Sequence, residues 1–230
     1  MTRWLKQADY KKRFFVADLS PEQRPALADL KPQLVFVAES PHVSEVEPEV
    51  ASARRPLCGS AGREWWSMLS TTLGGDSSRE TDLERLLSLC RKAGIAVMNA
   101  VQYPIDPKIM MHYGEAADPV THLGFAKVAP ASFKKLKNGE DVEAAIHALR
   151  ARLIHPSVID VPVVSLGNDA QWFVTQALKA KPGEGRHLMT VPHPSAWWRK
   201  GGAFREKARG QLKELLGTQE TKKSRLTVNG

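Results

Sequence analysis

Residues 33–66 read QLVFVAESPHVSEVEPEVASARRPLCGSAGREWW, and this stretch decides the fold. It opens with an apolar run, Leu34 to Ala38, typical of a buried strand of a parallel sheet. The sequence ESPH follows at residues 39–42, at the strand end where open α/β sheets place their ligands. GSAG, at residues 59–62, then leads into a helix that we expect from about Arg63. Because a helix start offers backbone N–H groups to an anion, the stretch predicts a carboxylate facing an anion-binding turn.

Composition restricts the class of protein. The chain has 230 residues, of which 42% are hydrophobic and 25% charged, a balance typical of a globular domain. We find no apolar run of membrane-spanning length and no signal-peptide core. Two cysteines, Cys58 and Cys90, argue against a disulfide framework and a four-thiolate metal site, so we expect a cytoplasmic protein. The length fits one domain over residues 1–218, followed by a basic tail, 219–230, that we expect to be disordered.

The chain is strongly basic. Its formal net charge is +8 and its isoelectric point is about 9.6. Such a balance attracts polyanions, of which nucleic acid is the commonest. The charge therefore favours a nucleic-acid partner, although it does not specify one.

Apolar runs alternate with amphipathic segments, which predicts a three-layer α/β/α domain with a central four-stranded parallel sheet. Strands are expected at residues 33–38, 95–101, 161–166 and 187–192. Helices are expected at residues 4–17, from Ser20-Pro21 onward, and at 63–73, 80–92, 140–153, 168–180 and 203–216. The long, irregular segment 102–138 is of the kind that is usually functional or mobile. Parallel strands end at one edge of their sheet, where we expect Glu39, Asn99, Gly167 and His193 to converge.

Four motifs stand in a fixed order along the chain. AESPH (38–42) with PLCGSAG (56–62) comes first, then VMNAV (97–101), VVSLG (163–167) and VPHPSAWW (191–198). Together, over about residues 33–211, they resemble the uracil-DNA glycosylase superfamily. The thermophile-type branch of that family has Gly-Glu-Ala-Pro-Gly followed by Pro-Phe-Val-Gly-x-Ala-Gly, and later strands ending in Asn, Leu-Gly and His-Pro-Ser. Each motif alone is weak, since the HPS triplet recurs at residues 155–157, where we interpret it as a structural turn.

The resemblance implies a monofunctional DNA glycosylase, which hydrolyses the N-glycosidic bond of a pyrimidine in DNA. Glu39 matches the catalytic acidic residue, which stabilises the oxocarbenium-like sugar and positions a water molecule. His193 matches the group that donates a hydrogen bond to O2 of the departing base. Asn99 matches the amide that reads the Watson–Crick edge of the extruded base. No lysine stands in the motif positions to form a Schiff base with the sugar.

The family also extrudes its target nucleotide from the duplex, and the matching residues imply how this chain would bind DNA. Trp197 falls where the family places the apolar wedge that fills the gap, and Trp198 is the alternative. The phosphates would be bound by Ser40, Pro41, Gly59, Ser60 and Ser195, with sequence-independent attraction from Arg199, Lys200 and Arg205. This mechanism requires no metal and no cofactor, and we expect a monomer.

Three departures from the family pattern affect the predicted substrate. The four cluster-binding cysteines of the branch are missing, so we expect no iron–sulfur cluster. Leu57 stands where an aromatic residue stacks on uracil, and His42 where the best-known branch has a tyrosine that excludes a 5-methyl group. The hypothesis that follows is a pocket for a 5-modified pyrimidine, such as 5-hydroxymethylcytosine or its glucosylated form, and hence a role in defence against phage.

Other interpretations remain open from the sequence. One is an ordinary uracil repair enzyme with a divergent pocket. The others are a non-catalytic DNA-binding module on the same fold and a nucleotide-binding protein that uses the glycine-rich turn at residues 59–62.

Overall fold

A four-stranded parallel sheet forms the centre of the protein. The computed structural model describes residues 7–75, 82–105 and 140–228, with side chains described for 10–75, 82–105 and 142–217. The strands are β1 (Leu34–Ala38), β2 (Ile95–Asn99), β3 (Val163–Leu166) and β4 (His187–Val191). They lie in the order β2-β1-β3-β4, and each neighbouring pair is parallel. The predicted α/β class with a four-stranded parallel sheet is therefore confirmed.

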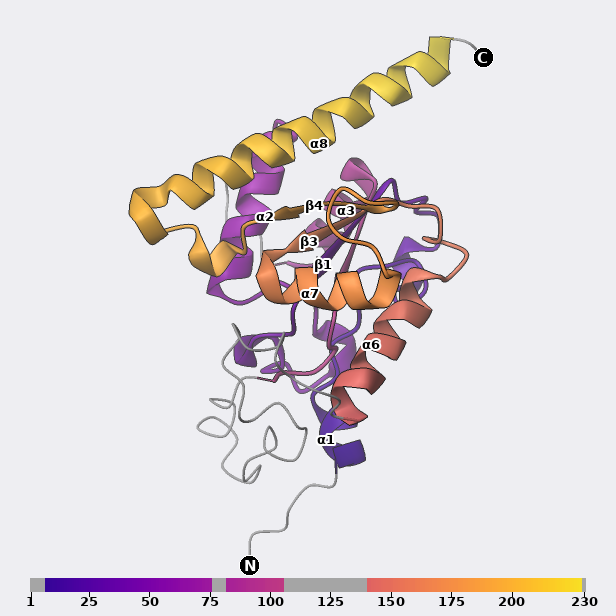
Figure 1. Ribbon diagram of the computed structural model, residues 1–230, viewed down its shortest axis with the longest axis vertical. Helices are drawn as coiled ribbons and strands as arrows, with labels where there is room; N and C mark the ends of the chain where they lie inside the picture. Colours follow the sequence, from indigo (N-terminus) through magenta and orange to yellow (C-terminus); the bar gives the residue numbers. More distant parts are fainter. Residues whose placement is uncertain (1–6, 76–81, 106–139, 229–230) are drawn as a thin grey trace, which may run out of the picture.

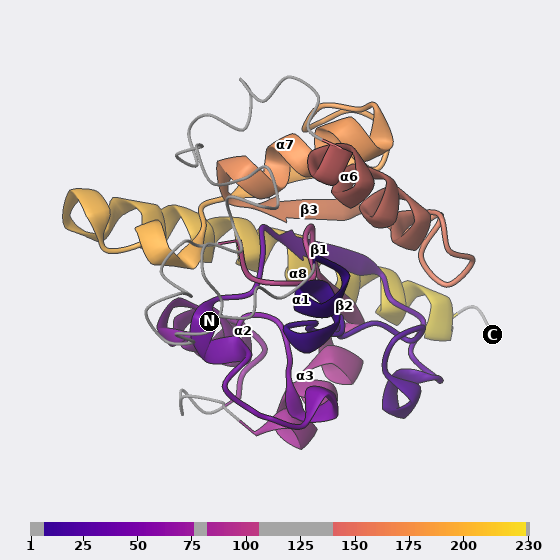
Figure 2. The same cartoon turned by 90° about the horizontal axis from the view of Figure 1, so that it is seen from below.

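Helices cover both faces of the sheet. Figure 2 shows α6 (Glu140–Leu153) and α7 (Gly167–Leu178) on one side, and α2 (Ser60–Thr72) and α3 (Leu83–Ala93) on the other. The long C-terminal helix α8 (Ala203–Val228) crosses beside α2 and β4, and α1 (Gln7–Arg13) lies at the opposite end of the molecule (Figure 1). The 3₁₀ turns are η1 (Pro25–Leu27), η2 (Val43–Glu45), η3 (Ala51–Ala53), η5 (Pro194–Ala196) and η6 (Arg199–Gly202).

The strands are apolar throughout because both of their faces are buried. In β1, Val35 and Val37 belong to the hydrophobic cluster that also contains Phe173 of α7. The alternate residue Phe36 belongs to the second cluster, where its ring contacts the Trp65 ring of α2 at a centroid distance of 5.3 Å. Successive strand side chains point to opposite faces, so a continuous apolar run serves two cores at once.

Helix α2 begins at Ser60, three residues before the expected start, and Gly59 is its N-cap. Gly62, in the first turn, lies against Leu57: a Cβ at Gly62 would come within 1.9 Å of the Leu57 carbonyl oxygen. Trp66 fixes the same carbonyl by donating its Nε1–H at 2.8 Å. Leu57 itself has φ +59°, a left-handed conformation that is uncommon for a leucine. The glycine-rich turn is thus a tightly packed corner.

Two local expectations were wrong. No α-helix begins at Ser20-Pro21. Leu19 instead pairs with Val97 through reciprocal backbone hydrogen bonds of 2.8 and 2.9 Å, and a turn follows. The tail expected to be disordered from residue 219 continues α8 as a helix to Val228. Most of the segment 102–138 lies outside the described residues. Among the described helices, none combines the length and apolar character needed to cross a membrane.

Candidate functional site

The carboxyl edge of the sheet carries the four residues expected there. Asn99 ends β2, Glu39 directly follows β1, Gly167 directly follows β3, and His193 is two residues beyond β4. The register pairs Ala38 with Asn99, and the Val101 N–H donates to the Glu39 carbonyl at 2.9 Å. Because β1 has β2 on one side and β3 on the other, the chain reverses its direction across the sheet there, and open α/β sheets bind ligands at such a point.

His193 and Gly167 lie against each other at this edge. Gly167 has φ +86°, and a Cβ on it would come within 2.7 Å of the His193 Cβ. The glycine therefore lets the loop after β4 approach the end of β3. This contact fixes the position of the imidazole relative to the two central strands.

Asn99 has an unusual environment for an amide. Its exposed fraction is 1%, and neither Nδ2 nor Oδ1 has a hydrogen-bond partner. A buried polar atom without a partner costs about 1–3 kcal/mol, so native proteins satisfy nearly all of them. An amide with both a donor and an acceptor unpaired is ready to bind a ligand that presents the complementary pair.

The backbone of Asn99, in contrast, is held on both sides by a buried ion pair. Asp18 and Arg152 lie 2.7 Å apart, and both are buried. Asp18 accepts the Asn99 N–H at 3.2 Å. Arg152 donates to the carbonyl oxygens of Asn99 and Ala100, each at 2.9 Å. Burial raises the pKa of Asp18, and the Arg152 guanidinium counteracts that rise.

The Asp18–Arg152 pair was not predicted from the sequence. Asp18 stands in an irregular N-terminal segment, and Arg152 is one of two arginines in the last turn of α6. The two residues are 134 positions apart, and neither belongs to one of the four motifs. Only the fold brings them together behind β2.

His193 is neutral and carries its proton on Nε2. The Ser195 N–H donates to His193 Nδ1 at 3.2 Å, which makes Nδ1 an acceptor and places the ring proton on the other nitrogen. Ser195 Oγ also lies 2.8 Å from Nδ1. Burial lowers the pKa of His193 to about 4. Its Nε2–H is therefore a neutral hydrogen-bond donor at physiological pH.

The same turn occurs at two other histidines. His42 Nδ1 accepts from the Ser44 N–H at 3.2 Å, and His155 Nδ1 accepts from the Ser157 N–H at 3.3 Å. The triplet at 155–157 lies in the turn between α6 and β3, before a strand, as expected for a structural element. The His-x-Ser turn is thus a general capping device in this protein. What distinguishes His193 is its place beside Gly167 at the carboxyl edge.

A buried carboxyl group organises the turn before α2. Glu45 is 5% exposed, and it accepts the Leu57 N–H at 3.1 Å. Burial raises the pKa of Glu45 to about 8, although hydrogen bonds from the backbone of His42, Gly59 and other turn residues counteract the rise. Glu45 thereby links the ESPH loop to the glycine-rich turn. Sequence reasoning missed it, since nothing distinguishes it from the neighbouring glutamates.

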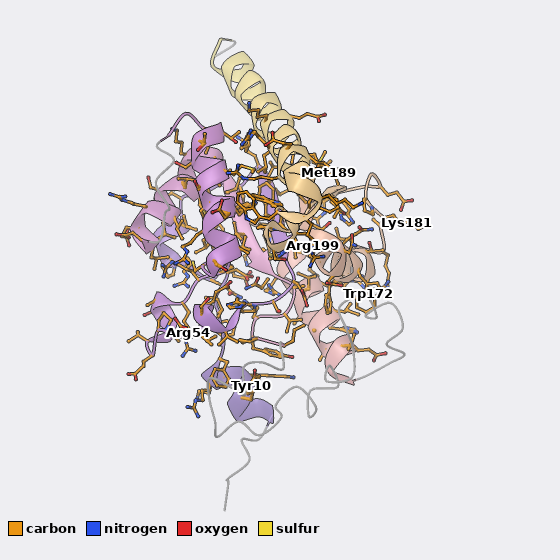
Figure 3. The ribbon with its side chains drawn as sticks, turned by 90° about the vertical axis from the view of Figure 1, so that its left-hand side faces the viewer. Tyr10, Arg54, Trp172, Lys181, Met189 and Arg199 are labelled. Carbon is orange, nitrogen blue, oxygen red and sulfur yellow. The ribbon has the colours of Figure 1, made fainter. Side chains whose placement is uncertain are left out.

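A pocket of about 340 Å³ separates the start of α2 from the turn after β4. It is lined by Ser60, Ala61, Arg63, Glu64, Pro194, Ser195 and Trp198. The structure therefore brings together Ser60 and Ser195, two of the predicted phosphate-binding residues. Arg199 and Lys200 are exposed on the adjoining turn before α8, and Figure 3 labels Arg199 there.

The two tryptophans of the last motif have opposite environments. Trp197 is fully buried in the core beneath α2 and α8, and its Nε1–H donates to the Pro192 carbonyl at 2.9 Å. Trp198 is 63% exposed and lines the pocket. The prediction that Trp197 is the DNA wedge is at odds with this burial, because the turn η5 directs its side chain inward. The alternative, Trp198, is the accessible one.

The remaining predicted residues vary in accessibility. Glu39 and Ser40 are half-buried, Pro41 is buried and His42 is exposed. Gly59 packs against His42, since a Cβ on Gly59 would lie 3.2 Å from the His42 Cβ. Leu57, predicted to line the base pocket, is 5% exposed and packs in the core cluster that includes Trp66.

Within the described part of the chain, no group of three or more His, Cys, Asp or Glu side chains is arranged to hold a metal ion. The chain was compared with protein-family models, and none matches it. Nor does any curated protein match it.

Proposed function

We propose that this protein is a monofunctional DNA glycosylase, which hydrolyses the N-glycosidic bond of an extruded pyrimidine and leaves an abasic site. The observation that carries the proposal is the buried amide of Asn99, whose donor and acceptor are both unpaired at the sheet edge that also carries Glu39 and His193. A pyrimidine presents a matching donor–acceptor pair on its Watson–Crick edge. We further propose that it acts as a monomer in the cytoplasm.

The proposed chemistry divides between two side chains. Departure of the base leaves positive charge on the sugar and negative charge on the base, and Glu39 stabilises the former and positions the attacking water. His193 stabilises the base anion by donating its Nε2–H. A neutral donor suits this task, and the low pKa of His193 keeps it neutral.

The proposed substrate is a pyrimidine with a 5-substituent, such as 5-hydroxymethylcytosine or its glucosylated form. Leu57 packs in the core and supplies no aromatic face for stacking, and His42 is exposed where the family's tyrosine would exclude a 5-methyl group. The Asn99 amide reads either cytosine or uracil according to its orientation. An ordinary uracil enzyme is therefore the second candidate. Since 5-modified cytosines occur in phage DNA, a defence role follows from the first.

The test is incubation with DNA carrying uracil, a thymine mismatch, 5-hydroxymethylcytosine or glucosylated cytosine, followed by detection of alkali-labile sites. We expect strand breaks with the 5-modified cytosines. Breaks with plain uracil alone would show that the pocket is not enlarged. DNA binding without breaks on any substrate would leave a non-catalytic DNA-binding protein.

Two variants test the assigned roles. Glu39→Gln should abolish excision while the dissociation constant for DNA stays within a few-fold. His193→Asn should lower the rate of excision by about 10²–10⁴-fold. Its matched control is His155→Asn. This substitution alters the second HPS triplet, which lies at the other edge of the sheet, and it should leave the rate of excision unchanged. Equal losses in the two histidine variants would remove His193 from the mechanism.

A further inference from the structure

The pocket between α2 and η5 is large enough for a small-molecule group. Its volume of about 340 Å³ lies at the lower end of the range for small-molecule sites, roughly 300–1,000 Å³. Its walls come from the first turns of α2 and from the turn that follows His193. Asn99, Glu39 and His193 are not among its lining residues, so it is not the site proposed for the extruded base.

Trp198 offers an aromatic platform in this pocket. Its side chain is 63% exposed, although most tryptophan side chains are largely buried. The Arg205 guanidinium lies over the indole ring, 5.0 Å from its centroid. That contact occupies one face of the ring and restrains its orientation, which leaves the other face to stack on a planar group.

The charges around the pocket favour a polyanion that carries such a planar group. Arg205 also pairs with Glu64 across 3.8 Å, so the pocket's one glutamate is partly neutralised. Arg63 contributes a guanidinium to the lining itself, and Ser60 and Ser195 contribute hydroxyl groups. A nucleotide within a DNA strand combines an aromatic ring with a phosphate on each side, which matches this lining.

The pocket adjoins the proposed reaction centre through Ser195. This serine lines the pocket, and its backbone and hydroxyl group both contact the His193 ring. A strand whose extruded base meets His193 would therefore pass its next nucleotide into the pocket. We propose that the pocket binds the nucleobase beside the extruded one, stacked on Trp198, and that the protein thus prefers single-stranded or locally opened DNA.

The position beside the extruded base rests on the proposed function, whereas base stacking on Trp198 does not. The binding test uses two single-stranded oligonucleotides of equal length and charge: oligothymidine and a chain of abasic residues. Stacking of one base on an aromatic side chain contributes roughly 5- to 150-fold in affinity. The wild-type protein should prefer oligothymidine by about this factor, and Trp198→Ala should lose most of the preference while binding the abasic chain as before.

Two further variants sharpen the result. Trp198→Phe keeps a ring and should retain part of the preference. Ile154→Ala, which removes a comparably exposed apolar side chain near the opposite edge of the sheet, should retain all of it. The affinity for duplex DNA should change less in Trp198→Ala than the affinity for single strands. An unchanged preference in Trp198→Ala would overturn the proposal.

A separate experiment tests whether the stacked base is the one directly beside the extruded base. It uses an oligonucleotide that carries the base to be excised, with Glu39→Gln to prevent turnover. An abasic residue placed directly beside that base, on one side only, should weaken binding when Trp198 is present and not when it is alanine. Equal effects in both backgrounds would exclude the neighbouring position. If stacking is found but no base is excised, the proposed function fails and the stacking site stands.

Discussion

The guanidinium of Arg152 donates to the backbone carbonyl oxygen of Asn99 at 2.9 Å, while the side-chain amide of Asn99 has no hydrogen-bond partner. Asp18 accepts the N–H of the same residue and pairs with the same guanidinium. A buried ion pair adds little stability over well-packed apolar residues, because desolvation of both charges offsets their attraction. The arrangement instead fixes the backbone from which the Asn99 amide projects.

Removal of Arg152 should expose this dependence. Arg152→Met leaves the Asp18 carboxylate buried without its partner, which costs about 3–5 kcal/mol of the free energy of unfolding in denaturant titrations. Adding Asp18→Asn removes that charge, so the double variant should be more stable than Arg152→Met alone. Arg150→Met, an exposed arginine in the same helical turn, should change stability by less than about 0.5 kcal/mol. Similar losses of unfolding free energy in Arg152→Met and Arg150→Met would contradict a specific role for the Asp18–Arg152 pair.

Gly167 and Gly183 form a natural pair for testing the His193 contact. Their φ angles are +86° and +87°, but a Cβ on Gly167 would meet the His193 Cβ at 2.7 Å, whereas one on Gly183 would meet nothing within 4 Å. Gly183→Ala should therefore report backbone strain alone, roughly 1–2 kcal/mol in the free energy of unfolding. Gly167→Ala should cost more and should also lower the excision rate. Equal costs with full activity would mean that the loop moves aside freely.

The alternating apolar runs sufficed to predict the sheet and its edge. Each run in β1 and β2 is buried on both faces, as a parallel sheet covered by helices requires, and that topology places Asn99 and Glu39 on neighbouring strand ends. Local signals also worked where one residue decides the geometry. The helix expected at residues 80–92 ends close to its predicted end, because Gly94, at φ +63°, forms the left-handed C-cap of α3.

The failures share a physical cause, which is tertiary contact between distant segments. Trp197 and Trp198 are adjacent in sequence and chemically identical, and the packing of the distant helix α2, together with α8, against η5 decides which one is buried. Leu19 forms an extended pair with Val97, which overrides the local helix signal at Ser20-Pro21. Asp18, Arg152 and Glu45 acquire their roles by burial, which no local pattern encodes.

His193 should remain active in weakly acidic solution. Its folded pKa of about 4 lies below the usual 6.5, so the folded state binds fewer protons than the unfolded state between these values. The stability contribution of His193 is therefore complete above about pH 6.5 and is lost as the pH falls toward 4. The excision rate should show no His193-dependent decline between pH 8 and 5. The ¹⁵N chemical shifts of the His193 ring, assigned by comparison with His193→Asn, should report a neutral imidazole over that range. A titration of these shifts near pH 6.5 would contradict the lowered pKa.

Glu45 should give the opposite dependence. Burial raises its pKa from the usual 4.5 to about 8, so between these values the folded state holds a proton that the unfolded state has released. The Glu45 contribution to stability is present below about pH 4.5 and is lost as the pH rises toward 8. Glu45→Gln stays neutral and still accepts the Leu57 N–H, so it should gain stability relative to wild type as the pH increases. Denaturant titrations at pH 5, 6.5 and 8 measure this difference. As a control, Glu47→Gln, a substitution at an exposed neighbour, should have the same free energy of unfolding as wild type at each pH. If the difference in this free energy between Glu45→Gln and wild type does not change with pH, Glu45 is ionised throughout the range.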